Sequence, residues 1–155
     1  MFTILVINPG STSTKIALFR DENPLFTASL PHSSEELASF PTIYSQFAFR
    51  RQAILKILEE KNVKIEEIDA FVGRGGLLHP VASGTFRVGP AMLTQLEKAD
   101  FGEHASNLGA ILAHELAAMY GRPAFIVDPV VVDELEPEAR LTGHPMLPKQ
   151  CIFHA

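Results

Sequence analysis

The chain opens with an almost unbroken apolar run over residues 3–7, which stops at Asn8. A short turn with a proline, a glycine and four hydroxyl residues follows, and a second apolar run begins after Lys15. Two apolar runs around a short glycine-containing turn predict a β-hairpin with buried strands. This beginning favours a fold built on a sheet, with a polar turn at the end of a buried strand.

The turn offers backbone N–H groups, hydroxyls and a lysine to one point, and such groups suit phosphate oxygens. It leads into a strand, and the chain has no G-x-x-x-x-G-K-[ST] motif, so it is not a P-loop. Serine and threonine are also common in turns for structural reasons, because their side chains bond local backbone groups. The residues that we expect to contact phosphate are Asn8, Gly10, Ser11, Thr12, Ser13 and Lys15.

The rest of the chain predicts helices that alternate with strands. A third strand over residues 25–30 would complete an antiparallel three-strand meander. The later elements are helices at 42–61, 90–98 and 106–120, strands at 68–72 and 124–127, a hairpin or extended loop at 77–88 and a helical turn at 134–140. This order predicts an α/β fold with a mixed sheet and helices on both sides. In the helix over 42–61, Arg50 and Arg51 are expected off the apolar face.

Composition limits the class of protein. The 155 residues, 46% of them hydrophobic, suit one domain with a real core. Eighteen acidic and thirteen basic residues give a net charge of −5, and no basic cluster exceeds Arg50-Arg51, so we expect no nucleic-acid partner. The single cysteine, Cys151, excludes an internal disulfide framework. With no apolar run near the roughly 18 residues of a membrane span and no recognisable leader, a cytoplasmic protein without a membrane partner is expected.

Three polar groups each follow a predicted strand: Asn8, Arg74 and Asp128. Sites in open α/β sheets gather beyond the carboxyl ends of the strands, so we expect these groups at one edge. Arg74, in a glycine-rich loop, is suited to clamp a carboxylate or a phosphoryl group by two parallel hydrogen bonds. Asp128 is suited to hold magnesium or to orient a phosphoryl acceptor. The structural alternatives are a solvated arginine in a glycine turn and an Asp-Pro turn opener.

A segment rich in polar residues precedes the helix at 106–120. There His104 is placed to donate to an anion near the helix N-terminus, although a loop histidine without function is the alternative. Ser106 or Asn107 is expected to cap the helix. Physical reasoning alone assigns no role to His154. Surface or loop positions are expected for His32, His79, His114 and His144, whereas Asp133 and Glu134 are expected at the surface or at a helix start.

Five segments together resemble the butyrate kinase branch of the acetate kinase family, in the order and approximate spacing of that family. The segment at 72–78 and the Asp-Pro-Val-Val-Val run at 128–132 favour the butyrate branch over acetate kinase proper. The resemblance spans essentially the whole chain. Its segments are VINPGSTSTK at 6–15, VGRGGLL at 72–78, GEHASNLGA at 102–110, FIVDPVVVDE at 125–134 and IFHA at 152–155.

The resemblance implies a ribonuclease H-like domain of the actin-like and sugar-kinase-like type. It also implies a reversible phosphorylation of a short-chain carboxylate, such as butyrate or a branched-chain relative, by ATP with Mg²⁺. By the same resemblance the turn binds phosphate, and Arg74 and His104 lie near the carboxylate and the transferring group. Asp128 lies near magnesium and the reaction centre, with Asn8 as the second metal contact. His154 stabilises the transferred group.

Members of that family are longer and carry a second domain that closes the cleft and completes the site. We therefore expect residues 1–155 to form the amino-terminal domain of a two-domain kinase, inactive by itself and prone to self-association through exposed apolar surface. The family tends to form dimers or larger assemblies, which predicts a homo-oligomer. Two alternatives stay open: another actin-like-fold phosphotransferase or phosphatase with the same turn, and a non-catalytic binding domain.

Overall fold

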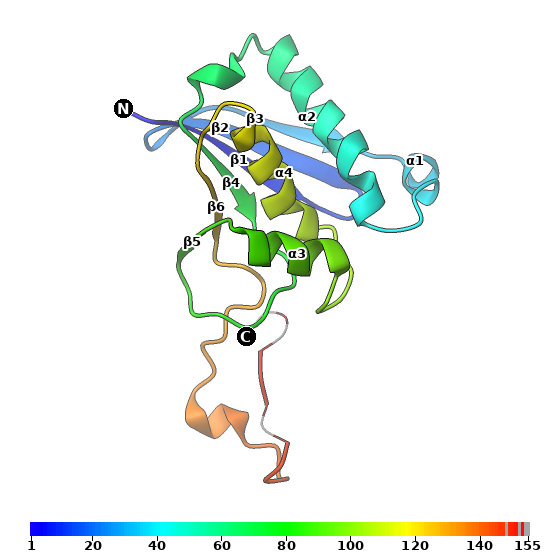
Figure 1. Ribbon diagram of the computed structural model, residues 1–155, viewed down its shortest axis with the longest axis vertical. Coiled ribbons are helices and arrows are strands. Elements are labelled where there is room, and N and C mark those ends of the chain that lie inside the picture. The colour runs from blue at the N-terminus through cyan, green and yellow to red at the C-terminus, as the bar shows by residue number, and fades with distance from the viewer. Residues whose placement is uncertain (148, 152, 154–155) are drawn as a thin grey trace.

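The computed structural model describes residues 1–147, 149–151 and 153, which are built around a six-stranded mixed sheet (Figure 1). Across the sheet the strands follow the order β3-β2-β1-β4-β6-β5. The strands are β1 (Thr3–Pro9), β2 (Ser13–Arg20), β3 (Asn23–Pro31), β4 (Ala70–Arg74), β5 (Thr85–Arg87) and β6 (Ala124–Val127). The predicted mixed α/β sheet is confirmed.

The first three strands form the predicted antiparallel meander. The turn between β2 and β3 is shorter than expected, because β3 already begins at Asn23. Asp21 occupies the tight turn with a φ of 51°, in the left-handed region that Asp tolerates better than most residues. Beyond the meander, β4 runs parallel to β1 and β6 parallel to β4, while the short edge strand β5 is antiparallel to β6. The segment at 77–88 is therefore a loop that ends in an edge strand.

Four α-helices accompany the sheet in the described residues. Three short 3-10 helices lie at Tyr44–Gln46, Ile65–Glu67 and Pro137–Arg140. The helix expected over 42–61 begins later as an α-helix, because the residues before Phe47 form the first of these 3-10 turns. No helix in the described part of the chain is both long and apolar enough to cross a membrane. The α-helices are α1 (Ser34–Ala38), α2 (Phe47–Glu60), α3 (Pro90–Lys98) and α4 (Asn107–Ala118).

Helices were expected on both sides of the sheet, but in the described residues α2 and α4 cover the same face (Figure 1). That face presents Leu5, Ile16 and Phe71, which are at most 3% exposed and pack with both helices in one core. Burying a side chain of this size stabilises the fold by about 1.5–3 kcal/mol. On the opposite face, the paired Val6 and Ala17 are only half-buried. The alternation of strand side chains explains the difference between the two faces.

Helix α4 lies unusually close to β4. A Cβ atom at Gly109 would lie 2.1 Å from the carbonyl oxygen of Arg74, and one at Gly73 would lie 2.2 Å from the carbonyl oxygen of Gly109. The glycine-rich segment after β4 is thus tightly packed and not a flexible loop, since Gly75 and Gly76 also lie against Pro129 and Asn107. Close packing of α4 holds the carboxyl end of β4, and with it Arg74, in place.

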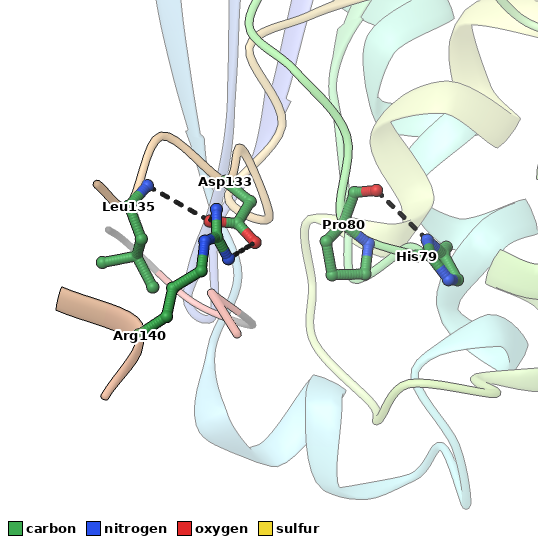
Figure 2. Close-up of polar contacts among 5 residues, drawn as sticks. All are labelled: His79, Pro80, Asp133, Leu135 and Arg140. Carbon is green, nitrogen blue, oxygen red and sulfur yellow. Dashed lines mark hydrogen bonds and ion pairs between the residues drawn. The ribbon is translucent and has the colours of Figure 1, made fainter. Parts of the chain in front are cut away.

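A local ion pair joins two residues of the chain after β6. Arg140 donates two hydrogen bonds to the carboxylate of Asp133, at 2.8 and 2.9 Å, and the backbone N–H of Leu135 donates to the same carboxylate (Figure 2). These bonds hold the pKa of Asp133 below its ordinary value, mainly because of Arg140. The expectation that Asp133 is a surface residue is wrong, because its side chain is only 13% exposed. Nearby, the ring of His79 lies 3.1 Å from the carbonyl oxygen of Pro80 (Figure 2).

Candidate active site

The carboxyl ends of three adjacent parallel strands carry the predicted polar groups. Asn8 is near the end of β1, Arg74 is the last residue of β4, and Asp128 follows β6 directly. Arg74 pairs with Val127, so the ends of β4 and β6 are level. The expected meeting of these groups at one edge of the sheet is confirmed.

A cavity of about 320 Å³ lies at this edge. It brings together the turn after β1, Arg74 from β4, and His104 and Ser106 from the segment before α4. Val130 and Phe153 complete the wall. The cavity thus gathers residues from segments far apart in the sequence. The predicted site residues that line it are Asn8, Gly10, Ser11, Ser13, Lys15, Arg74 and His104.

The turn is closed by a backbone hydrogen bond of 2.7 Å from the N–H of Gly10 to the carbonyl of Ser13. On its two sides Asn8 and Lys15 are direct partners in the antiparallel β1–β2 pair. Residues paired in this way carry their side chains on the same face of a sheet. An amide, a lysine and two serines therefore converge on one wall of the cavity, a donor set suited to an oxyanion.

His104 is held in one orientation by Ser106. The backbone N–H of Ser106 donates to Nδ1 of His104 at 3.2 Å, and the Ser106 Oγ lies 2.7 Å from the same nitrogen. Because Nδ1 accepts, the neutral ring carries its proton on Nε2, as a donor to a ligand oxygen. Ser106 was expected only as a helix cap, but its side chain makes no capping bond to α4.

Asp128 lies apart from the turn. It lines a second cavity of about 360 Å³ with Glu134 and Arg74, and the two cavities share Arg74 and Val130. The Oδ1 of Asp128 accepts from the N–H of Gly84 at 2.7 Å, and the N–H of Asp128 donates to the Gly84 carbonyl at 3.1 Å. Asp128 has a φ of 38°, so it sits in a tight left-handed turn. The structural role of a turn residue and the proposed contact with a ligand are both compatible with this geometry.

The arrangement fits a magnesium ion that arrives with a nucleotide. The described residues hold no cluster of three or more His, Cys, Asp or Glu side chains that would form a metal cage. Magnesium at phosphate-transfer sites is held by one or two carboxylates, waters and the phosphates themselves. Asp128, with Glu134 at the same cavity, meets this smaller requirement. Asn8 lines the other cavity and could contact the ion only from there.

Two of the predicted site residues that the structure describes, Thr12 and Asp128, do not line the first cavity. Thr12 is exposed and does not line it, because the turn directs Thr12 outward and its carbonyl accepts from the N–H of His32 at 2.9 Å. His154 lies outside the described residues. Glu134 is exposed, as expected, and it also lines the second cavity beside Asp128.

Sequence reasoning missed the buried polar residues whose hydrogen bonds hold the segments of the site in place. Arg50 was expected off the buried face, but its side chain is 0% exposed and bonds the turn. His32 was expected at the surface, but it is 5% exposed, and its Nε2 lies 2.8 Å from Thr14 Oγ1. Asn107 was expected as a cap, but its side chain bridges the Leu77 N–H and the Gly102 carbonyl, each at 2.9 Å.

Comparison with known proteins identifies the relatives of this chain. No protein-family model matches it. It is 54% identical over 154 residues to butyrate kinase 2 and 50% identical over 155 residues to butyrate kinase 1, both from Clostridium acetobutylicum. The chain is homologous to the butyrate kinases. A probable butyrate kinase of Coprothermobacter proteolyticus is 51% identical over 154 residues. These matches cover 99%, 100% and 99% of this chain but only 43%, 44% and 43% of the relatives.

Solved structures of acetate kinases share the fold. The Porphyromonas gingivalis enzyme superposes with a TM-score of 0.60 at 18% identity, over 94% of this chain and 42% of that one. The Entamoeba histolytica enzyme gives a TM-score of 0.57 at 12% identity, over 92% of this chain and 39% of that one. At this identity the likeness shows the fold alone, and it confirms the predicted ribonuclease H-like, actin-like architecture.

Proposed function

We propose that this butyrate kinase homologue forms the amino-terminal domain of a two-domain kinase that phosphorylates a short-chain carboxylate. The carboxylate oxygen attacks the γ-phosphorus of ATP, and the bond from that phosphorus to the bridging oxygen of ADP breaks. The products are an acyl phosphate and ADP, with no proton gained or lost by the carboxylate. The observation that carries the proposal is the single cavity that joins the oxyanion-binding turn to Arg74 and His104.

In this proposal the residues act mainly by position and charge, which is what phosphoryl transfer asks of a protein. The turn and Lys15 bind phosphate oxygens. Arg74, which lines both cavities, binds the carboxylate or the transferring group, and His104 donates from Nε2 to a phosphoryl oxygen. A carboxylate is nucleophilic at neutral pH, so no general base is needed. His154 is proposed to stabilise the transferred group.

Magnesium, when bound with ATP, would supply charge neutralisation at the phosphates. We propose that Asp128 holds it from the second cavity and that Asn8 contacts it from the first. Asp128 then orients the metal and its waters and does not act as a base. The complete enzyme is proposed to be a cytoplasmic homo-oligomer, without nucleic-acid or membrane partners, in which a second domain supplies the adenosine contacts.

The test is an acyl hydroxamate assay on the full-length protein that carries this sequence. With Mg-ATP and hydroxylamine, it should give hydroxamate from butyrate, isobutyrate or propionate, and it should not act on sugars or polyphosphate. Phosphorylation of a sugar or hydrolysis of polyphosphate would instead support another actin-like-fold phosphotransferase or phosphatase. Binding of ATP without turnover of any of these substrates would support a non-catalytic binding domain.

A further inference from the structure

Arg50 carries a buried charge that the mechanism above does not use. It lies in the first turn of α2 and is the largest fully buried side chain among the described residues, with 0% exposure. No ion pair in the described part of the chain involves it. A buried charge without a counter-charge is costly unless polar groups solvate it well. The contacts of Arg50 therefore indicate what it is for.

The guanidinium of Arg50 donates hydrogen bonds to carbonyl groups of the phosphate-binding turn. Its Nη1 donates to the carbonyl oxygens of Gly10 and Ser13, at 2.9 and 3.2 Å, and to Thr14 Oγ1 at 3.0 Å. Its Nη2 makes a longer contact, 3.4 Å, to the carbonyl oxygen of Ser11. Three carbonyl groups of one short turn thus point at a single buried cation.

Gln46 fixes the guanidinium from the other side. Its Oε1 accepts from Nε of Arg50 at 3.1 Å and from Nη2 at 2.9 Å. Gln46 is itself buried, with 6% exposure. The side chain that orients Arg50 is a neutral amide, so the positive charge beneath the turn is held without being neutralised.

The direction of these carbonyl groups decides where the N–H groups of the turn point. In a planar trans peptide, the C=O of one residue and the N–H of the next point in opposite directions. Because the carbonyls of Gly10 and Ser11 face Arg50, the N–H groups of Ser11 and Thr12 face away from it. Neither N–H donates to another backbone group in the described residues. Successive outward N–H groups of this kind form an anion-binding concavity.

We propose that Arg50 is a positioning residue for the phosphate-binding turn, which it shapes from behind while its uncompensated charge strengthens the binding of the ATP phosphates. The inference rests on the proposed function of the turn. Burial lowers the pKa of Arg50, but a guanidinium stays ionised in proteins. Its field acts through a low-dielectric interior, where a charge is screened far less than in water.

The first test is Arg50→Lys in the full-length protein. Lysine keeps the charge but cannot reach several acceptors in a planar fork, so the turn loses its shape. We expect the KM for Mg-ATP to rise by at least about tenfold and the KM for butyrate to stay within about twofold. Arg51→Lys is the matched control, because Arg51 is the next residue of α2 and packs on the Phe47 ring at 5.7 Å. It should leave both constants unchanged.

The second test is Gln46→Glu, which separates charge from shape. A glutamate keeps the oxygen acceptor for Arg50 and adds a negative charge that neutralises the guanidinium. We expect the KM for Mg-ATP to rise by at least about threefold while the melting temperature stays the same or rises. A residue with a merely structural role would give no such loss of nucleotide affinity in a protein that is at least as stable.

The outcomes separate this inference from the proposed function. If the parent protein makes acyl phosphate and both variants keep the KM for Mg-ATP within about twofold, the role of Arg50 is overturned. If the parent makes no acyl phosphate, the proposed function fails, and calorimetric titration with Mg-ATP still compares the parent with Arg50→Lys. Equal affinities, or no binding to the parent, would then overturn the inference as well.

Discussion

Asn8 and Lys15 stand directly opposite each other in the β1–β2 pair, and both line the cavity at the carboxyl edge of the sheet. Their side chains therefore share one face of the sheet, although the turn between them reverses the chain. This relationship depends on the register of the hairpin. A slip of one residue would send one of the two side chains to the opposite face.

We predict that Lys15→Ala, made in the full-length protein, lowers kcat/KM for Mg-ATP by at least about tenfold, or ~1.4 kcal/mol. The reason is the loss of a cation from a turn that we propose to bind phosphate oxygens. Asn8→Ala should act in the same direction. Steady-state kinetics provides the measurement, with Lys56→Ala on the exposed side of α2 as the control. A change of less than about twofold would remove Lys15 from the site.

Asp128→Asn tests the metal assignment. Asparagine tolerates the left-handed φ of 38°, and its Oδ1 can still accept from the Gly84 N–H, so the turn should keep its fold. We expect kcat to fall by about 100-fold, or ~2.7 kcal/mol, with little change in the KM for butyrate. The exposed Asp100→Asn serves as the control. An unaltered kcat would make Asp128 a turn residue only.

The stability of the protein should depend on pH through His32. Burial lowers the pKa of His32 and the neighbouring Arg50 lowers it further, against an opposing effect of Glu36. The unfolded chain then binds a proton more readily than the folded one, so stability is full above about 6.5, the ordinary pKa, and falls as the pH drops toward the folded-state pKa.

Urea denaturation of the full-length protein between pH 7.5 and 5.5 measures this effect. His32→Gln should flatten the pH dependence, and the same change at exposed His79 should not. The hydrogen bonds agree with a neutral ring. Since Arg50 donates to Thr14 Oγ1, the hydroxyl proton of Thr14 is available to donate to Nε2 of His32. Stability that stays constant or rises on acidification would contradict the assignment.

Gly109→Ala tests the close packing that holds Arg74. The added Cβ would overlap the Arg74 carbonyl. Because neither atom can move without its own backbone, α4 has to move away from β4. We expect a loss of about 1–3 kcal/mol in the free energy of unfolding and a weaker site. Gly89→Ala, where no atom lies within 4 Å of the new Cβ, is the control. Equal stabilities of the two variants would show that the contact is not important.

The strands other than β5, the meander and α3 could be predicted from local patterns, because each depends on apolar periodicity and on proline or glycine at an element end. The turn that we propose to bind phosphate could be predicted as well, because its polar residues are contiguous in the sequence. The gathering of Asn8, Arg74 and Asp128 at one edge followed from a general property of parallel strands.

Arg50 was missed because a charged residue was assumed to face solvent. The spacing did contain the signal: Gln46, Arg50 and Ile54 follow one another at intervals of four residues, which is one helical face. What local patterns do not contain is the partner. The carbonyl groups that solvate Arg50 lie about 40 residues earlier and meet it only in the folded chain. The separation of Asp128 from the turn is likewise a consequence of tertiary packing.

The most direct test of carboxylate phosphorylation is to trace the oxygen atoms of the carboxylate into the product. Butyrate labelled with ¹⁸O in its carboxylate is incubated with Mg-ATP and the full-length protein, and ³¹P NMR is recorded. Attack by the carboxylate predicts an acyl phosphate whose phosphorus signal is shifted by one bridging ¹⁸O, formed in equal amount with ADP and formed more slowly by Lys15→Ala. ADP and unlabelled inorganic phosphate, formed at the same rate with and without butyrate, would contradict the account.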